Sequence, residues 1–284
     1  MKKKLLALLL GLTLCLSLAA CGGDSAADSG AADTGAAEEG GDSAGTVTLT
    51  VAASPTPHAV ILEQCVPILA EQGIELVINQ YSDYVVPNTA VEDGDEDANY
   101  FQHLPYLEEF NETRGTHLVS VAGVHIEPMG IYAGRVESLE DLPDGAVIGI
   151  PNDPTNEGRA LLLLEAQGLI TLDDSSNLSA TPNNIVDNPK NLQFEEIEAQ
   201  TLPSSRPDLD LAVINSNYAL GAGLNPTTDA LAIESSDSPY LNVLVVKEGN
   251  EDNAAVQALV EALHSDTIRD FITEEFDGAV VPAF

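Results

Sequence analysis

Arg159 is the residue whose type and position could bind a small anion. It lies in a polar stretch, residues 151–159, between apolar runs at residues 146–150 and 160–164. This order predicts a buried strand, a loop and the start of a helix, and Gly168 is placed to end that helix. Backbone N–H groups at a helix start attract anions, whereas a cation there is mildly unfavourable.

The scarcity of basic residues makes this arginine informative. The chain has ten Lys and Arg residues against 46 Asp and Glu residues, and its formal net charge is −36. Arg159 could therefore have a bidentate partner such as a ligand carboxylate, or it could be a surface arginine paired with one of the many acids. The residues alone leave both interpretations open. The negative charge would repel nucleic acid and anionic lipid headgroups, so neither is expected as a partner.

A second candidate segment gathers rings in a chain that has no tryptophan. Tyr100, Phe101, His103 and Tyr106 lie within seven residues of one another. In an extended conformation Phe101 and His103 would point to the same face. These rings belong either to the core or to the wall of a pocket for an apolar side chain, with polar ring atoms facing a ligand.

The elements that position these residues predict an α/β protein. Residues 46–53 alternate apolar side chains with threonine, residues 59–72 have helical periodicity, and residues 75–78 are apolar again. A strand–helix–strand opening implies a parallel sheet whose ligand groups gather at the carboxyl ends of its strands. His58 lies in the first such loop, where it either faces a ligand or is exposed.

The length of 284 residues leaves room for two lobes. An extended segment at residues 125–132 suggests one crossing between the lobes, and the segments at residues 231–234 and 242–246 suggest a second. Polar residues 215–218 follow a buried strand, as the residues around Arg159 do. The other expected elements are strands at residues 118–122, 192–197 and 211–214 and helices at residues 253–264 and 268–276.

The first 45 residues read as a targeting segment. Three lysines precede an apolar run at residues 5–18, which is too short for a membrane span. Residues 18–21 resemble the lipobox of bacterial lipoproteins, which implies a signal peptide of residues 1–20 and lipidation of Cys21. The small and acidic residues up to residue 45 predict a disordered tether. Cys65, in a helical context, is expected to be a buried small hydrophobe.

Several short segments, taken together and in order, resemble the NlpA-type lipoproteins that bind methionine for an ABC importer. The resemblance covers the chain from about residue 46 to its end. It implies a periplasmic-binding-protein-like fold with ligand in the cleft, one lobe being residues 46–125 plus 238–284 and the other residues 126–237. The matching segments are residues 83–88, 97–103, 151–159, 188–192, 213–215 and 238–242.

The resemblance also implies a set of ligand-binding residues. Asn156 and Arg159 would hold the carboxylate of the amino acid, and Asn215 and Asn242 would orient its ammonium and carboxylate groups. The implied partners are methionine, with the L-enantiomer favoured, the permease and ATPase subunits of the importer, and the membrane through the lipid anchor. No cofactor is implied. The thioether pocket would be lined by Tyr84, Phe101, His103 and Tyr106.

Two other function classes would use other residues of the chain. A lipoprotein that delivers zinc or manganese could use His58, His103, His125 and Glu127, although these residues have no recognisable ligand spacing. A hydrolase could use paired carboxylates, but so many acids form pairs by chance. The sequence has no Gly-x-Ser-x-Gly elbow, and we do not expect an enzyme.

Overall fold

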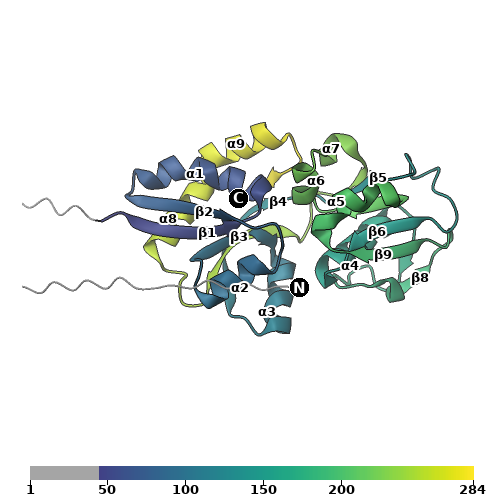
Figure 1. The fold of residues 1–284 in the computed structure, drawn as a ribbon, viewed down its shortest axis with the longest axis horizontal. Coiled ribbons are helices and arrows are strands. Elements are labelled where there is room, and N and C mark those ends of the chain that lie inside the picture. Colours follow the sequence, from purple (N-terminus) through teal and green to yellow (C-terminus); the bar gives the residue numbers. More distant parts are fainter. Residues whose placement is uncertain (1–44) are drawn as a thin grey trace, which may run out of the picture. The chain divides into compact units, whose positions relative to one another are not determined.

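The structure, a computed structural model, describes residues 45–284. Within them two β-sheets carry helices on both faces (Figure 1). The predictions for the signal peptide, for the lipidation of Cys21 and for the tether up to residue 44 lie outside the described residues. No helix within residues 45–284 has the length and apolar character needed to cross a membrane.

The first sheet has the strand order β13-β4-β12-β3-β1-β2. Strand β1 pairs in parallel with β2 and β3, so the parallel opening expected from the sequence is confirmed. The sheet as a whole is mixed, because β12 runs antiparallel to both β3 and β4. Its strands are β1 (Val47–Ala53), β2 (Ile74–Gln80), β3 (Ala98–His103), β4 (Leu118–Ile126), β12 (Leu241–Lys247) and β13 (Val281–Pro282).

Helices cover both faces of the first sheet. Figure 1 shows α1 and α9 on one side of it and α2 and α3 on the other, and α8 packs with α1 and α9 in one apolar core. Cys65 is fully buried in that core, as predicted, and burial raises the pKa of its thiol to about 12. The helices are α1 (Val60–Ala70), α2 (Val86–Asp93), α3 (Leu104–Arg114), α8 (Ala254–Leu263) and α9 (Asp266–Phe276).

The second sheet has the strand order β11-β5-β10-β6-β9. Leu211 and Val213 pack in the core beneath α4, whereas Ala212 and Ile214 pack with α5 and α6, as the two-residue period of a strand requires. The strands are β5 (Gly130–Ala133), β6 (Val147–Pro151), β9 (Gln193–Ile197), β10 (Leu211–Ile214) and β11 (Ala230–Ile233). The remaining elements are α4 (Pro154–Ala166), α5 (Leu202–Ser205), α6 (Ser216–Gly221), α7 (Pro226–Asp229) and the short pair β7 (Thr171–Leu172) and β8 (Ile185–Asp187).

The chain crosses between the two sheets twice. It leaves the first sheet after β4 and enters the second at β5, and it returns between β11 and β12. Glu127 lies in the first crossing and Glu234 in the second. The protein is therefore an α/β protein with a two-lobed fold.

Local sequence signals explain the start of α4. The Asp153 side chain accepts a hydrogen bond from the Asn156 backbone N–H at 3.0 Å, and Pro154 occupies the first helical turn. Gly168 adopts φ +71° just past the end of the helix, a left-handed conformation that glycine tolerates best. The predicted strand, loop and helix are thus all present.

Two expectations were incomplete. The sequence patterns did not predict α2 or α3, and the ring-rich segment divides at His103, where β3 ends and α3 begins. The His103 Nδ1 atom accepts a hydrogen bond from the Tyr106 backbone N–H at 3.1 Å, so this imidazole caps the helix. The suggestion that His58 is exposed is also wrong, since only 1% of its surface is accessible.

Candidate functional site

A cavity lies between the two sheets, beside the carboxyl ends of β3, β6 and β10. All eight residues that the resemblance marked for ligand binding line it. The space among its lining residues that no protein atom fills is about 340 Å³, part of which is open solvent. The lining residues are Tyr84, Phe101, Gln102, His103, Tyr106, Glu127, Asn156, Arg159, Asn215, Ser216, Asn217 and Asn242.

Arg159 is held inside the protein by residues of both crossings. Its side chain is 3% exposed, and its Nε and Nη2 atoms donate to the Glu234 carboxylate at 3.1 and 2.5 Å. Nη2 also donates to the Glu127 backbone carbonyl at 2.6 Å, and the guanidinium carbon lies 4.2 Å from the centre of the Tyr240 ring. Arg159 is therefore paired with an acid, as one interpretation expected, but it is buried and not on the surface. Its binding of a ligand carboxylate stays a prediction.

The pairing leaves part of the guanidinium available. Among the described residues, no hydrogen bond involves the Nη1 atom of Arg159. Glu234 occupies the edge formed by Nε and Nη2, so Nη1 is the nitrogen that a ligand carboxylate could reach. A carboxylate bound there would receive a charge-assisted hydrogen bond.

Asparagine amides form the polar side of the cavity. The Asn156 Oδ1 atom accepts hydrogen bonds from His103 Nε2 at 3.1 Å and from Asn215 Nδ2 at 2.7 Å. The Asn215 Oδ1 atom is buried and has no hydrogen-bond partner among the described residues. Asn242 uses its Oδ1 atom to contact His58 Nε2 at 3.0 Å. Because an unpaired buried acceptor is costly, Asn215 is suited to a ligand that brings a donor.

His103 is a neutral hydrogen-bond donor in this cavity. Its Nδ1 accepts the Tyr106 N–H, so the ring proton is on Nε2 and points to Asn156. Burial, and then the charge of Arg159, lower the pKa of His103 from 6.5 to about 3. The ring therefore stays uncharged at neutral pH.

The apolar side of the cavity is made of rings. The Tyr84 ring centre lies 5.9 Å from that of Phe101 and 5.8 Å from that of Tyr106. The Tyr84 hydroxyl donates to Asn217 Oδ1 at 2.7 Å, which links the loop between β2 and α2 to helix α6. Tyr100 does not line the cavity; it is fully buried, and its hydroxyl is hydrogen-bonded to His125.

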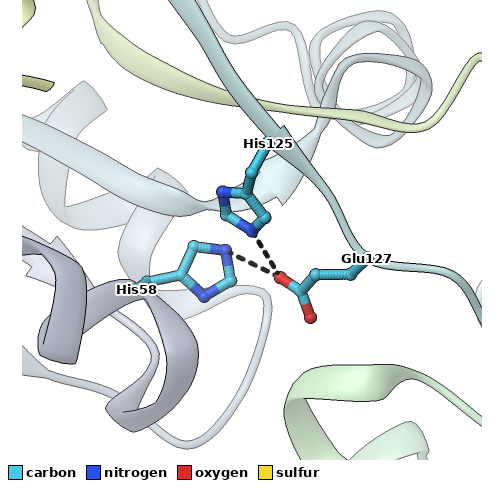
Figure 2. Close-up of side chains that lie close together, drawn as sticks. All are labelled: His58, His125 and Glu127. Carbon is cyan, nitrogen blue, oxygen red and sulfur yellow. Dashed lines mark hydrogen bonds and ion pairs between the residues drawn. The ribbon is translucent and has the colours of Figure 1, made fainter. Parts of the chain in front are cut away.

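The four side chains considered as metal ligands do not all come together. His58, His125 and Glu127 form one buried cluster (Figure 2), in which Glu127 Oε1 lies 3.3 Å from His58 Nε2 and 2.9 Å from His125 Nε2. His103 is not part of this cluster and contacts Asn156 instead. Burial lowers the pKa of His58 to about 4 and that of His125 to about 3.

Sequence reasoning missed several residues around the cavity. Ser216 and Asn217 line it directly after Asn215, and the polar run beyond a buried strand was the signal that could have identified them. Glu234 and Tyr240 hold Arg159 from the second crossing, and no local pattern distinguishes this glutamate from the other acids.

Comparison with known proteins places the chain in a family. The family model described as NlpA lipoprotein matches residues 49–284. The methionine-binding lipoprotein MetQ of Bacillus subtilis is 43% identical over 270 residues, which are 93% of each chain. The D-methionine-binding lipoprotein MetQ of Salmonella typhi is 44% identical over 211 residues, 74% of this chain and 78% of that protein.

A solved structure adds a ligand-bound relative. This is the structure of a nutrient binding protein from Burkholderia cenocepacia bound to methionine. Its sequence is 41% identical to that of this chain, and the two folds superpose with a TM-score of 0.80. The match covers 83% of this chain and 100% of the other. The chain described here belongs to the NlpA lipoprotein family.

Proposed function

We propose that this protein captures methionine in the cavity between its two sheets and delivers it to an ABC importer, without chemical turnover. The observation that carries the proposal is that a buried arginine, Arg159, and several aromatic rings line the same cavity. Relatives named for methionine binding support the ligand, as does the methionine-bound relative. None of these three relatives is named for a metal.

Methionine matches the chemistry of the cavity. Its carboxylate would meet the free Nη1 atom of Arg159, and its ammonium group would meet the unpaired Oδ1 atom of Asn215. The thioether would lie against Tyr84, Phe101 and Tyr106, where sulfur–aromatic contact contributes about 0.3–1.5 kcal/mol. Because a free amino acid is a zwitterion, the net negative charge of the protein repels it little.

Calorimetric titration of Arg159→Ala with methionine tests this proposal. We expect a loss of affinity of roughly 30-fold or more, since removing one partner of a buried charge pair costs about 2–5 kcal/mol. Arg159→Lys keeps the positive charge beside Glu234 but loses the planar fork, so we expect an intermediate affinity. The matched control is Arg135→Ala, because Arg135 also pairs with an acid, Asp210, but is half exposed and lies outside the cavity.

Unchanged affinity in a folded Arg159→Ala protein would contradict the proposal, as would an equal loss in the Arg135→Ala control. Titration with each enantiomer separately shows which one the site prefers. The relatives are named both for methionine and for D-methionine, so both ligands belong in the experiment.

We further propose that the lobes are residues 46–125 plus 238–284 and residues 126–237, and that they move about the two crossings to admit and release ligand. Lipid on Cys21 would hold the protein on the extracytoplasmic face of the membrane, where it would meet the permease and ATPase subunits of the importer. Substitution of Cys21 by alanine should move the protein from the membrane fraction to the soluble fraction. Continued membrane retention of that variant would contradict the anchor.

A further inference from the structure

The aromatic end of the cavity, formed by Tyr84, Phe101 and Tyr106, borders a second hollow in the protein. Tyr84 and Tyr106 line both the cavity and this hollow, so the two spaces share these rings as a wall. The space among the residues of the hollow that no protein atom fills is about 820 Å³, part of which is open solvent. The charges that line the hollow therefore act on the aromatic end of the cavity.

Acidic side chains predominate around this hollow. Its lining includes four carboxylates, those of Asp83, Glu109, Asp153 and Glu198, and a single cation, Arg114. Arg114 is exposed to solvent, which screens its charge, and its guanidinium lies against the Phe110 ring. Asp153 is only partly exposed, so its charge is screened less. The aromatic end of the cavity therefore lies in a negative local field.

Asp153 is an acid whose charge acts on several rings of the cleft. Burial raises the pKa of Tyr84, Tyr106 and Tyr218. The negative charge of Asp153 raises the pKa of each of these tyrosines further, because it disfavours a second negative charge nearby. The Asp153 carboxylate itself is kept in place by the hydrogen bonds it accepts at the start of α4, from the backbone and side chain of Asn156.

The rings at this end are arranged as neighbours of one another. The Tyr84 ring centre lies 5.9 Å from that of Phe101 and 5.8 Å from that of Tyr106, and the last two are 6.2 Å apart. Aromatic ring faces attract cations, most strongly where water is excluded, and groups of rings bind quaternary ammonium ligands in this way. A neutral thioether makes no use of this attraction or of the negative field.

We propose that the cavity also binds sulfonium derivatives of methionine, in which the side-chain sulfur carries a third carbon and a positive charge, and that Asp153 favours them over ligands with a neutral side chain. This inference rests on the proposed function and deepens it by naming a further ligand class. Arg159 would hold the carboxylate as it does for methionine. A sulfonium suits the rings better than an ammonium, because it has no N–H group that would be buried without an acceptor.

A matched pair of ligands tests the preference for a cation. S-Methylmethionine and 2-amino-5-methylhexanoate have the same branched side chain, but the sulfonium of the first is a neutral CH group in the second. Calorimetry of the wild-type protein should show that S-methylmethionine binds roughly 10-fold more tightly or better. Both ligands are used in the enantiomeric form in which the protein binds methionine, and methionine is titrated alongside them.

Substitution of Asp153 tests the source of the preference. Asp153→Asn removes the charge but keeps an oxygen that can cap α4, and it should reduce the preference for S-methylmethionine by about threefold or more. A disturbance of α4 or of Asn156 would weaken both ligands alike and cancel in the ratio of their affinities. The matched control is Asp174→Asn, which removes an equal charge from an exposed turn outside both spaces and should keep the wild-type preference.

The outcomes separate this inference from the proposed function. If the wild-type protein does not bind methionine, the proposed function is wrong. If it binds methionine but binds 2-amino-5-methylhexanoate as tightly as S-methylmethionine, the function stands and this inference is overturned. An unchanged preference in Asp153→Asn, or an equal loss in Asp174→Asn, would overturn the role of Asp153. Should Asp153→Asn fail to fold, the wild-type comparison of the two ligands still decides whether the cavity favours a sulfonium.

Discussion

The neutral state of His103 predicts a specific dependence of stability on pH. The folded protein holds this ring with a pKa of about 3, against 6.5 when it is free of the fold. Between these values the unfolded chain takes up a proton that the folded protein does not. The contribution of His103 to the free energy of unfolding is therefore intact above pH 6.5 and is lost as the pH falls towards 3.

The size of the effect follows from the shift. At pH 5 the free ring lies 1.5 units below its pKa of 6.5, and at about 1.4 kcal/mol per unit the fold loses about 2 kcal/mol relative to pH 7.5. The pKa of His103 in the folded protein hardly affects this loss of stability, because about 3 is well below pH 5. His103→Asn removes the titration but keeps an oxygen that can cap α3, since asparagine is a favoured N-cap residue.

The measurement is denaturant unfolding of wild-type protein and His103→Asn without ligand, at pH 7.5 and pH 5. The variant loses the hydrogen bond to Asn156 at both pH values, so it should be less stable at pH 7.5. Its deficit should shrink, or reverse sign, by about 2 kcal/mol at pH 5. Other groups also titrate in this range, such as Glu157, whose pKa burial raises to about 7. Their contribution to the pH dependence is the same in the wild-type protein and the variant, so it cancels when the two are compared.

A control variant and a clear negative result complete the design. Tyr84→Phe also removes a hydrogen bond at the cavity, but neither ring changes charge between pH 5 and pH 7.5, so its deficit should be the same at both. If the deficit of His103→Asn is likewise independent of pH, then His103 is not held neutral by the fold and the assignment of its proton is wrong.

Two further substitutions probe closure and packing. Tyr84→Phe removes the bond to Asn217 across the cavity; it should weaken methionine binding by about 0.5–1.5 kcal/mol, mainly through faster dissociation measured by stopped flow. Tyr81→Phe, which loses a bond to Glu96 within one lobe, should leave the dissociation rate unchanged. Gly158→Ala would place a Cβ atom 2.4 Å from the Leu178 carbonyl oxygen, so we expect thermal unfolding to show a loss of about 1–3 kcal/mol. Gly221→Ala, whose Cβ would meet its nearest neighbour at 3.8 Å, should not destabilise, and equal stabilities of the two variants would contradict this packing argument.

Much of the fold could be predicted because its signals are local. The strand, loop and helix around Arg159 are specified by an apolar run, a capping aspartate and a terminal glycine, all within 25 residues. The α3 helix was missed because its cap is a histidine, an unusual N-cap residue, within a segment that looked extended. The ligand-binding residues came from the resemblance, because no local pattern shows which side chains meet in a cavity.

The sequence by itself determined the strand–helix–strand opening, the strand, loop and helix around Arg159, and the presence of one arginine at a helix start in a very acidic chain. Only the tertiary structure decided which acid that arginine meets. Glu234 is 75 positions away and is one of 46 Asp and Glu residues, so neither spacing nor charge could select it. The structure likewise decided that His58 is buried beside Glu127, 69 positions along the chain. Periodicity and capping depend on near neighbours, whereas ion pairs and proton positions depend on how two sheets pack.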